Sequence, residues 1–306
     1  MNSTSKMARK GVVLAACLLS WAGIARATDP GMPECAGVAG LRVLHEGLGA
    51  MESAAFLPSG KLVFSQSFKG KLMRKDSLAA PPTEVASGIN QPGGIVVNSE
   101  TEVVIGTGNG PAGLVPSLGL AGLARVDLER GQVTSILKGL SMANGVVKAP
   151  DGSYYASDDL ARSLDRVTPS GVVQRGWLKL NSNGLALSAD GGTLFVNQFL
   201  PAAIKAVNLA SGAVTVHAAV PLNRALAGPD GLDIDAQGNL YIAAYLSGEV
   251  WRASPGGQLC RLAKGLVLPA AVVVGKPGQG FATDSVYVLS HSGRMYEIAG
   301  AVPGTP

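Results

Sequence analysis

The chain alternates short apolar runs with polar turns along most of its length. The segment 183–196 shows the unit: an apolar run, the turn Ala-Asp-Gly, and a second apolar run. Runs of this length and period predict β-strands. Glycine in the turn supplies the positive φ that a tight connection between two strands requires. Each unit is therefore predicted to be a β-hairpin.

This hairpin pattern recurs through the chain. Its copies begin at Glu52, Gly93, Asn144, Asn183, Asp230 and Ala270, the second and last being weaker. A third strand often follows, as in 248–252, and stretches such as 131–137 have the pattern of a fourth. Four short strands in about 45 residues are typical of a propeller blade. The sequence predicts an all-β fold, a six-bladed β-propeller with four-stranded antiparallel blades around a central channel. A β-sandwich would not explain six similar units.

The N-terminus has a different pattern. Lys6, Arg9 and Lys10 precede the apolar run 11–24, and Ala25-Arg26-Ala27 has the small-x-small form of a cleavage site. This order is typical of a secretory signal peptide, and the run is shorter than the roughly 20 residues of a membrane span. We expect residues 1–27 to be a signal peptide and 28–306 a single propeller domain, exported to the periplasm or secreted. The segment 41–46 is expected to pair with the last blade and close the ring.

Removal of residues 1–27 changes the charge balance. It takes away four cations and leaves 21 cations against 21 anions. The remaining chain has no basic cluster, which argues against nucleic-acid binding. It has no second long apolar stretch, so we expect no membrane partner after cleavage. The oligomeric state stays open.

Cysteine usage agrees with export. Cys17 would leave with the signal peptide, and Cys35 and Cys260 would remain. An even pair in an oxidising compartment favours a disulfide, which would join the N-terminal segment to the penultimate repeat. Two unpaired cysteines are the alternative.

The residue that opens each clear repeat has an oxygen-bearing side chain. These residues are Glu52, Asn144, Asn183 and Asp230, followed eight positions later by Gly60, Gly152, Gly191 and Gly238. Equal spacing predicts equal placement, just before the innermost strand and near the central channel. Two carboxylates and two amides suit a hard cation, calcium first and magnesium or manganese next. Zinc would prefer nitrogen or sulfur ligands. Each residue alone could instead shape a turn.

The chain resembles the family of senescence marker protein, gluconolactonase and luciferin-regenerating enzyme, whose related propellers include paraoxonase, diisopropylfluorophosphatase and strictosidine synthase. The resemblance rests on the segments 182–188, 228–235 and 241–252. It implies a metal-dependent hydrolase of a small-molecule lactone or ester. By this resemblance Glu52, Asn183 and Asp230 match the family's metal ligands, and Asn144 matches a position that contacts the metal or the substrate. Asp230 also matches the carboxylate residue implicated in catalysis. A cation would polarise the carbonyl, with Asp230 as general base or nucleophile.

One departure from the family concerns the substrate. Sugar-lactone hydrolases commonly carry an arginine two residues before the position of Asn144, where this chain has Met142. The segments 118–122 and 199–202 are also apolar. We therefore expect a relatively hydrophobic lactone or ester, with Met142 at the substrate. His291, in the sixth repeat, is a candidate pocket or catalytic residue, or a turn residue.

Two other functions remain open at the level of sequence. A non-catalytic binding or scaffold propeller would use the metal only to hold the ring together. A propeller similar to strictosidine synthase would be metal-free and would need a catalytic glutamate. The chain has no Gly-x-Ser-x-Gly nucleophile elbow and no phosphate-binding loop.

Overall fold

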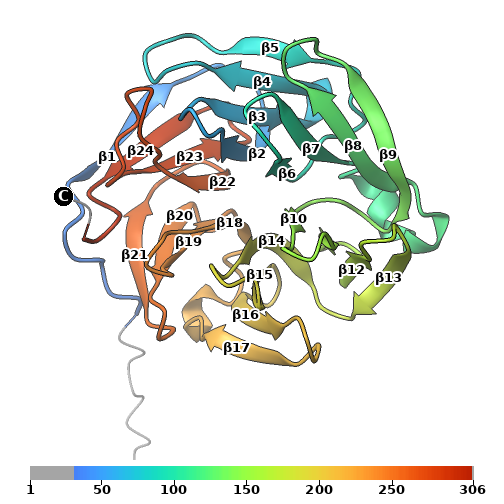
Figure 1. Cartoon of the computed structure of the whole chain (residues 1–306). Helices are drawn as coiled ribbons and strands as arrows, with labels where there is room; N and C mark the ends of the chain where they lie inside the picture. The colour runs from blue at the N-terminus through green and yellow to red at the C-terminus, as the bar shows by residue number, and fades with distance from the viewer. Residues whose placement is uncertain (1–30, 305–306) are drawn as a thin grey trace, which may run out of the picture.

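Six four-stranded antiparallel sheets surround a common axis in the computed structural model (Figure 1), which describes residues 31–304. The predicted six-bladed β-propeller is confirmed. The proposed signal peptide and Cys17 lie outside the described residues.

Each of the first three blades runs outward from the axis in chain order. The first contains β2 (Met51–Phe56), β3 (Leu62–Gln66), β4 (Lys71–Lys75) and β5 (Thr83–Ala86). The second contains β6 (Ile95–Val97), β7 (Glu102–Thr107), β8 (Ala121–Asp127) and β9 (Val133–Leu140). The third contains β10 (Val146–Lys148), β11 (Tyr154–Asp158), β12 (Ser163–Val167) and β13 (Val173–Leu178).

The remaining blades repeat this order, except that the last takes its outer strand from the N-terminal segment. The fourth contains β14 (Ser182–Leu187), β15 (Thr193–Gln198), β16 (Ala203–Asn208) and β17 (Val214–Ala218). The fifth contains β18 (Pro229–Ile234), β19 (Leu240–Ala244), β20 (Glu249–Ala253) and β21 (Leu259–Lys264). The sixth contains β22 (Pro269–Val274), β23 (Val286–Ser290), β24 (Met295–Ala299) and β1 (Gly40–His45).

The ring is closed by β1, which pairs with β24 from Gly40 opposite Ala299 to His45 opposite Met295. Figure 1 shows the blue strand lying beside the red one. The segment before β1 crosses the fifth blade, where Cys35 and Cys260 form a disulfide. The expected ring closure and the expected cysteine pairing are thus both present.

The hairpin turns have the predicted geometry. The four turn glycines all have positive φ, with values of 84°, 90°, 68° and 84° at Gly60, Gly152, Gly191 and Gly238. The apolar strand residues pack between neighbouring blades: Tyr241 and Val250 of the fifth blade share a cluster with Val272 and Val288 of the sixth. Because each blade buries its faces against two neighbours, the ring fixes where every innermost strand begins.

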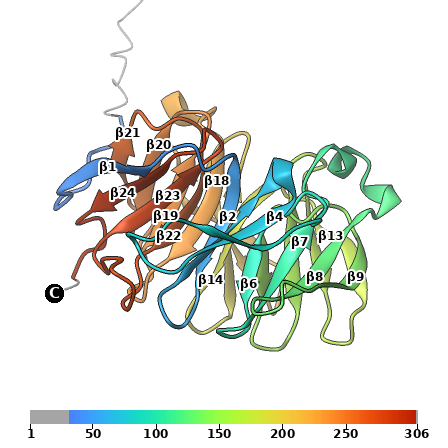
Figure 2. The same ribbon diagram turned by 90° about the horizontal axis from the view of Figure 1, so that it is seen from above.

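Four short 3-10 segments interrupt the loops: η1 (Ser67–Lys69), η2 (Pro111–Leu114), η3 (Pro116–Leu118) and η4 (Leu222–Arg224). They belong to loops that join the second strand of a blade to the third, or one blade to the next. Both kinds of loop lie on the same side of the ring as the start of each innermost strand, and Figure 2 shows the short coils along one edge. We call this side the site face. Within residues 31–304, no helix is long and apolar enough to cross a membrane.

Candidate active site

A cavity of about 630 Å³ lies on the propeller axis, lined by the innermost strands. The residues that open the four clear repeats all line it: Glu52, Asn144, Asn183 and Asp230. Equal spacing in the sequence therefore corresponds to convergence around one channel. Met142 is not among the lining residues. It is buried beneath the loop of η2, where a Cβ on Gly113 would come within 2.8 Å of its sulfur.

The glycines after three of these residues explain how the strands approach so closely. A Cβ on Gly145 would be 2.6 Å from the carbonyl oxygen of Asn183, and one on Gly184 would be 2.1 Å from that of Asp230. Neither glycine has a positive φ, in contrast to the hairpin-turn glycines. The Asn-Gly pairs at 144 and 183 are therefore close-approach positions at the axis, not turn formers.

The start of β18 is held from the neighbouring blade. The buried amide of Asn197 donates to the backbone carbonyls of Asp230, at 2.7 Å, and Gly231, at 3.0 Å. These bonds satisfy two backbone acceptors that lie beside the cavity. They fix the position from which the Asp230 carboxyl enters the site.

The carboxyl of Asp230 is perturbed by burial and by neighbouring charges. Its side chain is buried, and the loss of hydration raises its pKa well above the ordinary value. The negative charges of Glu52 and Asp159 raise the pKa further, while a hydrogen bond from Asn183 opposes the shift. A buried carboxyl among other carboxyls favours a cation or a proton as its partner.

The sequence pattern did not indicate Asp159. It lies in the turn between β11 and β12, outside the repeating position, and its Oδ1 is buried with no hydrogen-bond partner. Burial and the charges of Glu52 and Asp158 raise its pKa to about 6. The neighbouring Asp158 holds the turn, since its Oδ1 accepts from the backbone N–H groups of Leu160 and Ala161. The only signal in the sequence was the Asp-Asp pair after the second strand of the third repeat.

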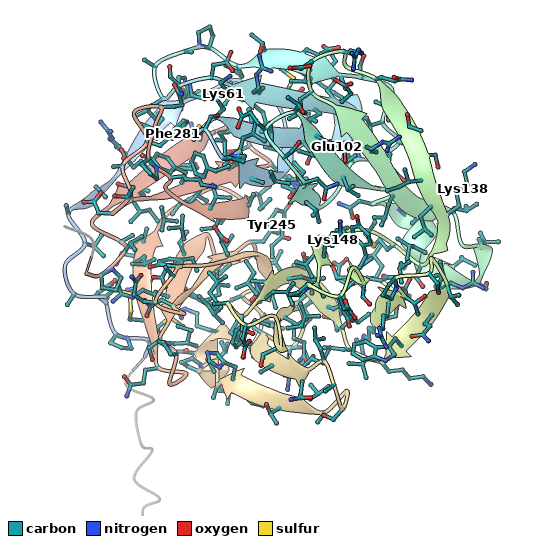
Figure 3. All side chains as sticks on the ribbon, in the orientation of Figure 1. Lys61, Glu102, Lys138, Lys148, Tyr245 and Phe281 are labelled. Atoms are coloured by element: carbon teal, nitrogen blue, oxygen red, sulfur yellow. A yellow bond between two sulfur atoms is a disulfide. The ribbon has the colours of Figure 1, made fainter. Side chains whose placement is uncertain are left out.

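Glu52 is tied into a chain of polar side chains. Its Oε2 lies 2.5 Å from Nε2 of His291, and its Oε1 accepts from Nδ2 of Asn109 at 2.8 Å. The other ring nitrogen of His291, Nδ1, lies 3.0 Å from the hydroxyl of Tyr245. In a neutral ring that donates to Glu52, Nδ1 accepts from Tyr245. Figure 3 shows Tyr245 near the centre of the ring. The repeat pattern of the sequence gave no site role to either Tyr245 or Asn109.

The donor set fits a hard divalent cation. Asn183 Oδ1 and Asp159 Oδ1 are buried without hydrogen-bond partners, and an unpaired buried acceptor is costly unless something binds it. Glu52, Asn144, Asn183 and Asp230 line the axial cavity, and Asp159 is near enough for its charge to act on Asp230. Carboxylate and carbonyl oxygens are the ligands that calcium prefers. Within the described residues, no three His, Cys, Asp or Glu side chains are grouped closely enough to hold an ion by themselves. A site here would have to combine carboxylates with the amide oxygens.

Part of the chain matches the model of a known protein family. The model of the SMP-30/Gluconolactonase/LRE-like region matches residues 166–279, which include Asn183 and Asp230. The similarity to this family therefore covers about a third of the chain, from the third blade to the sixth. The resemblance inferred from the sequence is thus confirmed for this part of the chain. A search of curated protein sequences finds no significant match.

Solved structures share the architecture of this chain. A gluconolactonase from Xanthomonas campestris is 20% identical, with a TM-score of 0.69 over 89% of this chain and 95% of that one. A calcium-binding regucalcin from Agrobacterium tumefaciens is 18% identical, with a TM-score of 0.64 over 88% and 95%. A virginiamycin B lyase from Staphylococcus aureus is 13% identical, with a TM-score of 0.57 over 85% and 98%. At these identities the likeness shows the fold.

Proposed function

We propose that the protein is an exported hydrolase of a lactone or ester. Its activity would depend on a divalent cation, for which calcium is the first candidate. The observation that carries this proposal is the convergence of Glu52, Asn183 and Asp230 at the axial cavity, with an amide oxygen of Asn183 buried and unpaired. The match to an SMP-30/gluconolactonase/LRE-like region supports hydrolysis. The predicted leader and the Cys35–Cys260 disulfide support export.

Glu52, Asn183 and Asp230 would hold the cation, and Asn144 would contact the cation or the substrate. When bound, the cation supplies positive charge that polarises an ester carbonyl and stabilises the oxyanion. Asn109 and His291 hold Glu52 in place from two sides, through the contacts described above. These second contacts orient a ligating carboxylate, as partners of ligands commonly do in proteins.

Asp230 is the residue that moves the proton. As general base it takes a proton from water while the water oxygen bonds to the carbonyl carbon; the carbon–oxygen bond of the lactone then breaks, and the leaving alkoxide takes the proton back. As nucleophile its carboxylate would attack the carbonyl carbon, and water would release the acyl group afterwards. Both routes need Asp230 ionised, which a bound cation favours.

The surroundings support a hydrophobic substrate. Met142 stands two residues before Asn144, where an arginine would hold a polyhydroxy substrate, so no cation is offered there; its own side chain is buried beneath the loop of η2 and does not line the axial cavity. The ring of Phe68 lies against His291, with centroids 5.9 Å apart. An acyl chain or an apolar ring would gain free energy by leaving water for a contact with Phe68.

The decisive first experiment measures the metal content of the purified protein and its thermal unfolding before and after chelation. We expect about one calcium per chain, a fall in melting temperature on chelation, and its recovery with calcium. Asn183→Ala and Asp230→Asn should lower metal content and abolish turnover of an ester and lactone panel. Asp190→Asn, in an exposed turn, is the matched control and should change neither. The proposal would be wrong if the purified protein contained no metal and its melting temperature did not respond to calcium.

One observation favours a second candidate. His291 joins Glu52 and Tyr245 in a hydrogen-bonded chain, and such a histidine could take a proton without any metal. A structurally similar protein is a lyase. Activity that survives chelation and is lost in His291→Gln would favour this metal-free chemistry. A fall in melting temperature on chelation, with no turnover of any ester, would instead favour a scaffold.

A further inference from the structure

The site face carries most of the exposed apolar side chains of the described residues. Seventeen large hydrophobic side chains are exposed, and eleven of them lie in loops of this face: Phe68, Leu114, Val115, Leu118, Leu120, Leu160, Leu222, Leu226, Leu246, Val267 and Leu268. The three most exposed are Leu222, Phe68 and Leu226, at 86%, 83% and 75%. We call these eleven residues the apolar rim. Soluble proteins rarely gather exposed apolar side chains on one face without a binding partner.

The apolar rim is distributed around the whole ring. Phe68 comes from the first blade, Leu118 from the second and Leu160 from the third. Leu222 lies between the fourth and fifth blades, and Val267 between the fifth and sixth. Side chains that surround an axis in this way can all meet one broad surface at the same time. A small molecule would touch only those nearest the axis.

The charges between the rim residues are mainly positive. Lys69, Arg162 and Lys179 are exposed, and within the described chain no ion-pair partner accompanies them. The exposed acid of this face, Glu46, is 2.9 Å from Arg294. The face therefore presents apolar side chains together with uncompensated cations.

A second cavity lies within this basic region. It has a volume of about 730 Å³ between the third and fourth blades, and its lining holds Arg162, Arg175 and Lys179 but no carboxylate. Leu200 and Pro201 form an apolar wall. Three cations beside an apolar wall match an anionic headgroup whose acyl chains continue into apolar surroundings.

We propose that the apolar rim docks the protein onto an anionic lipid surface, with a headgroup in the cavity of Arg162, Arg175 and Lys179. The docked orientation directs the site face at the bilayer, so an apolar substrate dissolved in lipid would approach from the side on which Glu52, Asn144, Asn183 and Asp230 begin the innermost strands. The proposal does not depend on the chemistry of that cavity. It amends the expectation that the protein has no membrane partner after cleavage, which rested on the lack of a spanning segment.

The test is vesicle cosedimentation of a chain that begins at Thr28, because the apolar run 11–24 would itself bind lipid. Residues 31–304 contain all six blades and the closing strand, so this chain keeps the complete ring. We expect binding to vesicles of equal phosphatidylglycerol and phosphatidylcholine, and much weaker binding to phosphatidylcholine alone. The triple variant Phe68→Ser, Leu222→Ser, Leu226→Ser should weaken the partition constant on the order of 100-fold. Lys69→Gln with Lys179→Gln should weaken it roughly tenfold, and only for the anionic vesicles.

The matched control replaces three exposed valines outside the apolar rim: Val172→Ser, Val214→Ser and Val216→Ser. It should bind vesicles as the unmodified chain does, and circular dichroism should show that both triple variants fold. Absence of binding to anionic vesicles, or equal loss in both triple variants, would overturn the proposal. If light scattering instead shows a dimer that the rim variant converts to a monomer, without vesicle binding, the rim is a protein interface and the lipid proposal is wrong.

Discussion

Asp233 illustrates how the propeller channel acts on a single carboxyl. It lines the axial cavity three residues after Asp230. Loss of hydration inside the channel raises its pKa to about 6, although its oxygens accept from the backbone N–H groups of Val274 and Ile234. Because the unfolded chain ionises this group near its ordinary value, folding favours the protonated form. Ionised Asp233 therefore destabilises the folded state, and the penalty grows between about pH 4 and pH 6.

This gives a prediction for Asp233→Asn. On going from pH 4 to pH 7 the variant should gain about 2 kcal/mol in free energy of unfolding relative to the unmodified chain. The comparison uses the change with pH, because asparagine also replaces one of the two backbone contacts. Urea unfolding at both pH values measures it. Asp190→Asn, in an exposed turn, should show no such gain. If the difference in free energy of unfolding between Asp233→Asn and the unmodified chain did not change with pH, Asp233 would be fully hydrated in the channel.

The sequence identified some residues of the site and missed others. The repeat identified four of them, because residues at the same position of each repeat occupy the same place in each blade: Glu52, Asn144, Asn183 and Asp230. Asp159 and Tyr245 lie in turns after the second strand of their blades, where the repeat sets no residue type. Their nearness to the axis depends on turn geometry and on contacts between blades, such as the bond from Tyr245 to His291. One sequence does not encode such contacts in any local pattern.

At the scale of elements, the innermost strands depend on glycine at the axis. Gly184 follows Asn183 in β14 and has no room for a side chain, because a Cβ would come within 2.1 Å of the carbonyl oxygen of Asp230 on β18. That contact joins two blades rather than two strands of one sheet. The sequence identified the Asn-Gly pair, but only the assembled ring shows that its glycine acts between blades.

We predict that Gly184→Ala lowers the free energy of unfolding by about 2–4 kcal/mol, as overpacking against rigid backbone does. It should also reduce metal affinity, because Asn183 and Asp230 must move apart. Gly192→Ala is the matched control in the same blade. Its Cβ would have its nearest neighbour at 3.5 Å, and Gly192 has no positive φ. Equal stability of the two variants in thermal and urea unfolding would show that the inner strands can separate freely.

At the scale of the molecule, the N-terminal segment holds the ring in two places. It supplies β1 to the sixth blade and is attached to the fifth by the Cys35–Cys260 disulfide. Beside the disulfide, Nε of Arg261 donates to Glu34 at 3.1 Å, and Nη1 of Arg261 donates to buried Glu249 at 2.9 Å. The disulfide therefore fixes the strand that closes the ring against the blade next to it.

Replacing both cysteines, Cys35→Ser with Cys260→Ser, should lower the free energy of unfolding by about 2–5 kcal/mol, because the bond closes a long loop. Metal content and the spectrum of the folded state should stay unchanged, since the disulfide lies at the outer edge of the ring. Glu34→Gln, which weakens the exposed ion pair alone, should cost less than about 1 kcal/mol. Calorimetry measures the stability of both variants, and reductant added to the unmodified chain provides a second test of the disulfide. A melting temperature of the unmodified chain that does not change with reductant would contradict the prediction.

The origin of β1 also sets the order in which the molecule can be completed. Five blades consist of consecutive segments, and each can form as soon as its residues are available. The sixth joins residues 40–45 to residues 269–299, so the first strand to leave the ribosome is the last to find its place. During synthesis and any passage through a membrane pore, β24 and the growing blades have an open edge. A chain that stops before residue 295 would lack β24, so β1 would have no partner and the edge of β23 would stay open. We expect such a chain to aggregate or be degraded rather than persist as a shorter propeller.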